Sequence, residues 1–269
     1  MSAMIGLVGG MGPYAGLDLL KKVYDNIDAG CDQDYPDVAF ISTSRLIPDR
    51  SHYIKHPETE NPAVGIMYCV KKLARMGASH IGISCNTAHA PIIMNQVRAY
   101  VELEELPVRL LSIVEETCTW SAENVDEARI ALFATEGTYL SRIYHSIFEK
   151  EGRFEIVEPE DDDKIRIWDA IYDKEFGIKA RSNPVDMRAV DNFRIVSERM
   201  MQDQGIAAFI MGCTEIPLGM SRLHMAATLI DPAKILARAL IRAVAPTKLK
   251  PESAPDKAAL SRPKAKVIS

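Results

Sequence analysis

The chain has 269 residues, of which 47% are hydrophobic and 26% charged, so it is a globular protein with a sizeable core. Its formal net charge of -5 argues against a protein built mainly to hold nucleic acid, which needs a basic surface. No apolar run approaches the ~20 residues of a membrane span, and the first residues lack the basic start of a signal peptide. We therefore expect a cytoplasmic protein without a membrane partner, whose five cysteines are reduced.

Apolar runs and helical patterns alternate along the first part of the chain. Residues 4–8 form an apolar run that ends in a glycine turn, after which apolar residues recur at helical spacing. The later runs are continuous rather than alternating, as expected where helices cover both faces of a parallel sheet. We expect strands at residues 4–8, 38–43, 80–84 and 108–114, and helices at 17–27, 62–76 and 90–103.

The same pattern starts again in the second part of the chain. The acidic segment 158–163 is expected to be a solvated loop, and Gly205 is a natural end for the long helical pattern before it. We expect strands at residues 128–134, 154–157, 207–211 and 224–230, and helices at 139–149, 186–204 and 232–244.

The repeated alternation predicts an α/β fold with two similar doubly wound domains, mainly parallel sheets and the site in the inter-domain cleft. Each half has an apolar strand that runs directly into a cysteine, Cys85 or Cys213, with a proline a few residues later. Residues 246–269 hold four prolines and five lysines, a composition that predicts a disordered basic tail. We expect a first domain of residues 1–115 plus 224–245 and a second domain of residues 116–223.

The glycine turn after the first strand matches the loose G-x-G-x-x-G/A dinucleotide pattern in Gly10, Gly12 and Ala15. In that mechanism, glycine lets the backbone approach a pyrophosphate at a helix N-terminus. The second strand should then end in an acidic residue that holds the ribose. It ends in Ile-Ser-Thr-Ser instead, which speaks against a nicotinamide oxidoreductase. A small-anion site made of backbone N–H groups and a plain tight turn both stay open.

The two strand-end cysteines carry the sharpest chemical signal. In open α/β sheets ligands bind beyond the carboxyl ends of the strands, which is where Cys85 and Cys213 are expected. Each precedes an expected helix start, with Asn86 or Thr87 and Thr214 as candidate N-caps. Because a helix N-terminus lowers the pKa of a thiol, two such thiols could transfer protons on opposite faces of one carbon.

Other interpretations of these cysteines are open from the residues alone. The two could be structural or incidental, since most cysteines are core residues. Cys85 and His89 lie four residues apart, so a Cys–His nucleophile pair or a metal site is conceivable. However, the chain has no Cys-x-x-Cys motif and no histidine cluster for zinc, so we expect no metal.

Two cations are candidate anchors for a carboxylate. Arg50 follows the second strand in Pro48-Asp49-Arg50-Ser51, and its planar guanidinium suits a carboxylate. Lys179, in Gly177-Ile178-Lys179-Ala180, is a weaker candidate. A solvent-facing position is the default for an arginine, and from the sequence alone a surface position is the favoured interpretation of Lys179.

Together these residues resemble the pyridoxal-independent aspartate/glutamate racemase superfamily, and within it the aspartate racemase branch. The resemblance spans residues 4–245. Where the glutamate racemase branch would begin with an Asp-Ser-Gly turn, this chain has GGMGP. The motifs that carry the resemblance are IGLVGGMGP, IPDRS, SCNTAH, FATEGT, GIKA and MGCTEIPL.

The resemblance implies two similar α/β domains with the substrate between them, no cofactor, no metal and a homodimer. It makes Cys85 and Cys213 the catalytic bases, and it makes Arg50 and Lys179 the residues that hold a side-chain carboxylate. After Lys179 the chain has Ala180-Arg181 where a glycine is usual. The substrate-binding residues that it implies, with the backbone of the glycine turn, are Gly10, Met11, Arg50, Asn86, Thr87, Thr138, Lys179 and Thr214.

The expected function is therefore an isomerase that inverts Cα of aspartate, glutamate or a related amino acid without a cofactor. One alternative is an isomerase or decarboxylase of the same superfamily that acts on a dicarboxylic acid. Another is a non-catalytic amino-acid-binding protein, which would need the cleft and Arg50 but not two thiols.

Overall fold

The structure is a computed structural model that describes residues 3–252. Within this range the chain forms two four-stranded sheets, in the order β2-β1-β3-β4 and β6-β5-β7-β8. All neighbouring strands are parallel. The equal strand order confirms the predicted fold of two similar α/β domains. The strands are β1 (Met4–Gly9), β2 (Val38–Ser42), β3 (Ala78–Ile83), β4 (Arg109–Leu111), β5 (Arg129–Ala134), β6 (Glu155–Val157), β7 (Ala208–Gly212) and β8 (Thr228–Ile230).

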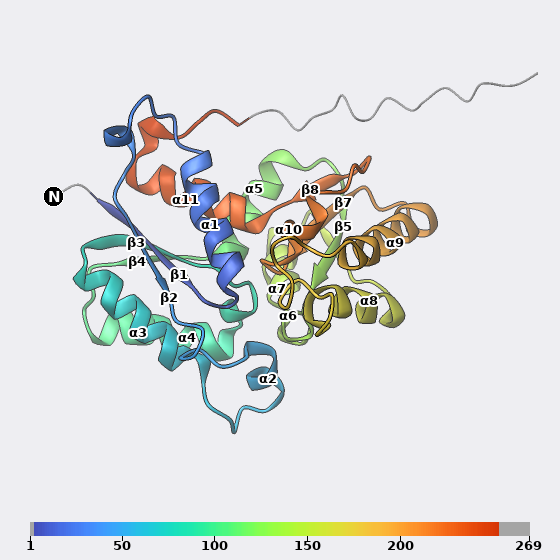
Figure 1. The fold of residues 1–269 in the computed structure, drawn as a ribbon, viewed down its shortest axis with the longest axis horizontal. Coiled ribbons are helices and arrows are strands. Elements are labelled where there is room, and N and C mark those ends of the chain that lie inside the picture. The colour runs from blue at the N-terminus through green and yellow to red at the C-terminus, as the bar shows by residue number, and fades with distance from the viewer. Residues whose placement is uncertain (1–2, 253–269) are drawn as a thin grey trace, which may run out of the picture.

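Helices cover both faces of the first sheet (Figure 1). α3 (Pro62–Arg75) and α4 (Pro91–Leu103) pack on one face, while α1 (Pro13–Asp25) and α11 (Pro232–Val244) pack on the other. Asp231 caps α11 by accepting a hydrogen bond from the amide of Lys234 at 3.0 Å, and a proline opens the helix. These local signals explain why the sequence predicts α11 at its observed bounds.

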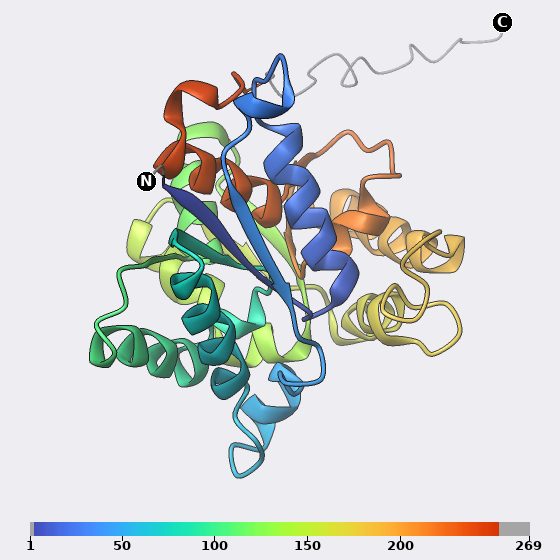
Figure 2. The same cartoon turned by 60° about the vertical axis from the view of Figure 1, so that its left-hand side comes forward.

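The second sheet is also covered on both sides, and the yellow and orange helices of this domain lie side by side at the right of Figure 2. α8 (Asp161–Tyr172) and α9 (Met187–Gln204) pack against each other on its outer face, and α10 (Ile216–Met220) packs on α9. α5 (Ile113–Asn124) and α7 (Ile143–Glu151) lie on the side of the first domain.

The two domains share one hydrophobic layer. α1, α5, α7 and α11 lie between the sheets, and their buried side chains form a continuous core with residues of β1, β5 and β7. Leu7 of the first sheet, Leu236 of α11 and Leu132 of the second sheet all belong to this core and are fully buried. Burial of this shared layer fixes the relative position of the sheets, so their carboxyl ends face a common region.

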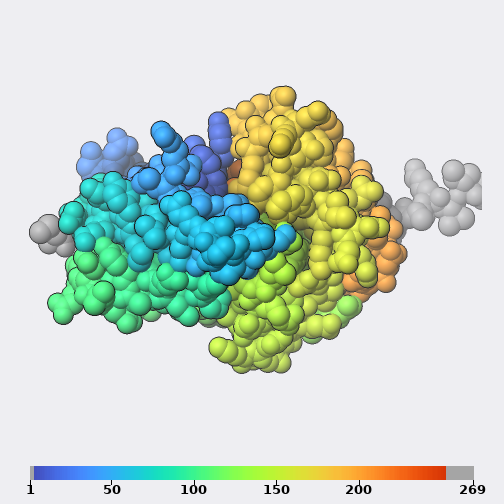
Figure 3. All heavy atoms as spheres, turned by 90° about the horizontal axis from the view of Figure 1, so that it is seen from below, coloured from blue at the N-terminus to red at the C-terminus, as the bar shows by residue number. Residues whose placement is uncertain are grey.

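Short helices join the domains beside these strand ends. α2 (Arg50–Lys55) contacts α6 (Glu136–Ser141), and in the space-filling view the light-blue segment around α2 reaches across to the second domain (Figure 3). The Ser51 hydroxyl accepts a hydrogen bond from the amide of Gly137 at 3.2 Å. Three 3-10 helices complete the described chain, namely η1 (Asp32–Asp34), η2 (Thr87–His89) and η3 (Pro246–Lys248).

Some predicted bounds are wrong, and local chemistry explains each error. The expected strand 108–114 is cut short because the Ser112 hydroxyl caps α5. The expected loop 158–163 contains the start of α8, whose first turn holds three aspartates that favour a helix N-terminus. The expected helix 139–149 is two helices, because Arg142 has a positive φ of 50°.

Two expectations about the end of the chain also change. The strand that we expected at 224–230 shortens to β8 and pairs with β7 of the second sheet, although our boundaries place it with the first domain. The domain boundaries otherwise stay a prediction. The tail predicted to be disordered from residue 246 is ordered over residues 246–252, where Leu249 pairs with Ile27 and Arg238 donates to the Lys250 carbonyl. Residues 253–269 lie outside the described residues.

Gly65 in α3 allows close packing of this helix against the loop that leads to Arg50. A Cβ at Gly65 would lie 2.0 Å from the Leu46 carbonyl oxygen and 2.8 Å from Ile47 Cγ1. Gly65→Ala must therefore push α3 and this loop apart, and we expect the free energy of unfolding in urea to fall by about 1–3 kcal/mol. The matched control is Gly30→Ala, where the nearest atom would be 3.6 Å away. An equal effect of both substitutions would contradict the close approach.

Candidate active site

The glycine turn brings backbone groups to the carboxyl end of β1. Gly10 has a φ of +91°, and a Cβ there would lie 2.8 Å from the amide nitrogens of Thr43 and Ser44. The turn therefore needs glycine for steric reasons. Met11 is buried, and its carbonyl accepts a hydrogen bond from Arg50. The Gly12 amide donates to the carboxylate of Glu215 at 2.9 Å, which links the turn to the second domain.

The two strand-end cysteines face the same cavity. Cys85 follows β3 and Cys213 follows β7, and the two side chains are buried. The cavity volume is about 10 Å³, the room that one water molecule needs. Most predicted site residues line it, whereas Gly10 and Thr138 do not. The lining residues are Met11, Arg50, Cys85, Asn86, Thr87, Thr135, Tyr172, Lys179, Cys213, Thr214 and Glu215.

Arg50 is a buried cation at the N-terminus of α2. Its guanidinium donates to the carbonyl oxygens of Met11 at 3.0 Å and Pro48 at 3.1 Å, but its Nε has no hydrogen-bond partner among the residues that the structure describes. Burial alone would lower the pKa of Arg50, but its interactions with Cys85 and Asp49 raise this pKa overall. Arg50 therefore stays charged, and it lies beside Cys85 at the small cavity.

Asn86 offers a second donor without a partner. Its Oδ1 accepts a hydrogen bond from the Tyr144 hydroxyl at 2.7 Å, which fixes the orientation of the amide. Its Nδ2 is buried and unpaired. Buried donors are nearly always paired in folded proteins. Two orphaned donors beside one cavity, Arg50 Nε and Asn86 Nδ2, therefore indicate a position for an anionic ligand atom.

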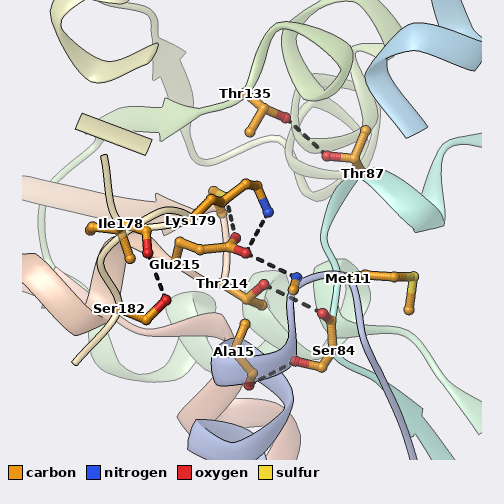
Figure 4. Close-up of polar contacts among 12 residues, drawn as sticks. Met11, Ala15, Ser84, Thr87, Thr135, Ile178, Lys179, Ser182, Thr214 and Glu215 are labelled. Atoms are coloured by element: carbon orange, nitrogen blue, oxygen red, sulfur yellow. Dashed lines mark hydrogen bonds and ion pairs between the residues drawn. The ribbon is translucent and has the colours of Figure 1, made fainter. Parts of the chain in front are cut away.

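The threonines of the site make different hydrogen bonds. Thr87 Oγ1 lies 3.0 Å from the Thr135 hydroxyl (Figure 4) and 2.9 Å from the Thr138 hydroxyl, so this hydroxyl cluster joins the two domains. Thr138 thus lies behind Thr87 rather than on the cavity. Thr214 donates to the carbonyl of Ser84 at 3.4 Å.

The sequence analysis missed three residues of the small cavity, namely Thr135, Tyr172 and Glu215, and of these Glu215 is the charged one. Its Oε1 accepts hydrogen bonds from Lys179 Nζ at 2.5 Å and from the Gly12 amide (Figure 4). Its Oε2 accepts from the Cys213 thiol at 3.0 Å. The only sequence signal for it is its place two residues after Cys213 in the MGCTEIPL motif.

The expected lowering of the thiol pKa is wrong for Cys213. Burial and the adjacent carboxylate of Glu215 raise the pKa of Cys213 well above its ordinary value, although Lys179 acts in the opposite direction. The helix that follows begins only at residue 216 and has no side-chain cap, so Thr214 is not its N-cap. Asn86 is at the N-cap position of η2 but makes no capping hydrogen bond.

The alternative pairing of Cys85 with His89 is not what the structure shows. His89 Nδ1 donates to the backbone carbonyl of Cys85 at 2.9 Å rather than to the thiol. Burial lowers the pKa of His89 to about 4, so the ring is neutral. Among the residues that the structure describes, no three His, Cys, Asp or Glu side chains gather as metal ligands.

A larger cavity adjoins the small one. Its volume is about 540 Å³, within the range of small-molecule sites. Lys179 and Glu215 line the two cavities and separate them. The other lining residues of this outer cavity are Gly12, Pro13, Tyr14, Ala180, Arg181, Ser182, Asn183, Pro184, Val185 and Asp186.

Comparisons with known proteins define the class of protein. The broad specificity amino-acid racemase RacX of Bacillus subtilis (strain 168) is 27% identical over 244 residues, which cover 88% of this chain and 96% of RacX. An aspartate racemase of Picrophilus torridus has the same fold, with a TM-score of 0.73 and 24% identity over 92% of this chain and 96% of that one. An aspartate racemase homologue from Pyrococcus horikoshii OT3 has a TM-score of 0.68 and 23% identity over 91% and 99% of the two chains.

The protein is thus an isomerase of the amino-acid racemase class. The family model of the Asp/Glu/Hydantoin racemases matches residues 8–240, and the chain belongs to that family. This confirms the resemblance drawn from the motifs. Of the helices in residues 3–252, none combines the length and the hydropathy that crossing a bilayer requires.

The raised pKa of Cys213 predicts a thiol that stays protonated at neutral pH. Since the folded-state pKa lies above the ordinary value, the thiolate should form only at strongly alkaline pH. We expect the ultraviolet thiolate absorbance of the wild type minus that of Cys213→Ser to be absent at neutral pH and to grow as the pH rises. A Cys213-dependent thiolate signal at neutral pH would contradict this assignment.

Proposed function

We propose that the protein inverts Cα of aspartate, glutamate or a related amino acid without a cofactor, by proton transfer between Cys85 and Cys213. The observation that carries the proposal is that these two thiols, from different sheets, line one buried cavity that also holds two orphaned donors. The family and the printed activities of RacX and the Picrophilus enzyme support it.

The proton balance needs one thiolate and one thiol. The thiolate takes the Cα proton and becomes a thiol, and the opposed thiol gives its proton to the other face of the carbanion and becomes a thiolate. Cys213 is the acid for one enantiomer, because burial and the adjacent Glu215 carboxylate keep the thiol protonated. Cys85, beside the Arg50 cation, is the base for that enantiomer. The roles reverse for the other enantiomer.

Substrate anchoring falls to the donors that have no partner. Arg50 Nε and Asn86 Nδ2 can each donate to a substrate carboxylate, and Thr87 and Thr214 add hydroxyls at the same cavity. Donors aimed at the carboxylate also stabilise the negative charge that develops when Cα loses its proton. Lys179 is the candidate for a side-chain carboxylate, as the resemblance implies.

Binding requires the cavity to enlarge. A volume of about 10 Å³ does not hold an amino acid, so we propose that the edge where the domains meet opens to admit substrate and closes again to exclude water. The homodimer and the cytoplasmic location stay proposals that rest on the resemblance and on the composition.

Single cysteine substitutions test the mechanism. We expect Cys85→Ser and Cys213→Ser each to lower kcat for racemisation by about 10²–10⁴, because each removes one proton-transfer group. The measurement follows formation of the opposite enantiomer, by chiral chromatography, from single enantiomers of aspartate. Cys118→Ser, a buried cysteine away from the cavity, is the control. Near wild-type rates in either cysteine variant would end the two-base scheme.

Arg50→Lys tests the carboxylate anchor. Lysine keeps the charge but loses the planar fork and the Nε donor, so we expect kcat/KM to fall at least about tenfold. Arg45→Lys in the same loop is the matched control, because Arg45 is exposed. Equal kinetics of the two variants would remove Arg50 from the binding site.

A further inference from the structure

The carboxylate of Glu215 is a buried charge that has other contacts besides the one that keeps Cys213 protonated. Only 4% of its side chain is exposed, compared with 25% for Lys179. Burial would raise the pKa of Glu215, but Lys179, the Cys213 thiol and the Gly12 amide together lower it. Glu215 is therefore an ionised group that uses three donors of the site.

Two of these donors are the kind that bind a carboxylate ligand. The Gly12 amide and the Lys179 ammonium converge on one oxygen of Glu215, at 2.9 Å and 2.5 Å. The resemblance assigns Lys179 to a substrate side-chain carboxylate, but in the structure an internal carboxylate already holds it. Lys179 and Arg50 are the cations that line the small cavity. Within residues 3–252 Lys179 has a carboxylate partner, whereas Arg50 has none.

The position of this ion pair places it at the end of a substrate side chain. Lys179 and Glu215 line the small cavity with the thiols and also the outer cavity. Gly12 lies at the same boundary, since a Cβ there would be 2.9 Å from Glu215 Oε1 and 3.8 Å from Lys179 Nζ. A substrate whose Cα lies between the sulfurs can extend its side chain to this boundary.

We propose that Glu215 is a specificity-determining residue that competes with a substrate side-chain carboxylate for Lys179 and the Gly12 amide. This inference rests on the proposed racemase function and deepens it. By neutralising Lys179, Glu215 lowers the kcat/KM of a dicarboxylic amino acid relative to that of its uncharged amide. It thereby broadens the range of side chains that the site accepts.

The experiment compares aspartate with asparagine, which differ only in the charge of the side-chain end. For each protein the readout is the ratio of kcat/KM for aspartate to kcat/KM for asparagine, from deuterium incorporation at Cα. Glu215→Gln frees Lys179, and we expect this ratio to rise about tenfold or more. Adding Lys179→Met to Glu215→Gln should return the ratio towards the wild-type value. Glu136→Gln is the matched control, because Glu136 pairs with Lys55 outside the cavities.

The ratio separates specificity from an effect on Cys213. Loss of the Glu215 contact to the thiol changes the rate for the two substrates alike, so a purely catalytic or structural role leaves the ratio unchanged and overturns the inference. If Glu215→Gln does not turn over, dissociation constants for aspartate and asparagine from calorimetry give the same ratio. If the wild type racemises amino acids but Glu215→Gln leaves the aspartate-to-asparagine ratio unchanged, only the proposed role of Glu215 is refuted. Wild-type failure to exchange Cα hydrogen in any amino acid refutes the proposed function as well.

Discussion

The layer of helices shared by the two sheets is the constraint on which the site depends. α1, α5, α7 and α11 bury apolar side chains against both sheets at once, and burial of apolar area is the dominant favourable term in folding. The sheets cannot turn relative to each other without exposing this layer. Cys85 and Cys213, which are 128 positions apart in the chain, therefore lie at one cavity because of packing far from either sulfur.

Polar contacts refine the position that the core sets. The Ser51–Gly137 hydrogen bond and the Thr87–Thr138 hydroxyl pair join the domains beside the cavity. They are few and lie near the strand ends, whereas the apolar layer extends along the helices. The proposed opening of the site requires these contacts and the other polar contacts beside the cavity, such as Gly12–Glu215 and Asn86–Tyr144, to break, while the shared core can remain packed.

The sequence predicted what depends on local signals and on strand ends. The bounds of α11, the end of α9 at Gly205 and the meeting of the strand-end cysteines follow from caps, glycine conformation and the parallel-sheet rule. The role of Glu215 could not be predicted, because its partner Gly12 lies 203 positions away in the other domain. The pKa of Cys213 was mispredicted because burial and a neighbouring carboxylate outweigh a helix terminus, and this balance depends on distances that the sequence does not contain.

A cavity with room for a single water also governs how long a proton stays with the protein. While the two domains remain closed, a hydrogen on either sulfur is shielded from exchange with bulk solvent, because both thiols are buried. Exchange of this hydrogen with solvent can then be no faster than the proposed opening of the domains. A hydrogen taken from the substrate therefore stays on the protein for as long as the site remains closed.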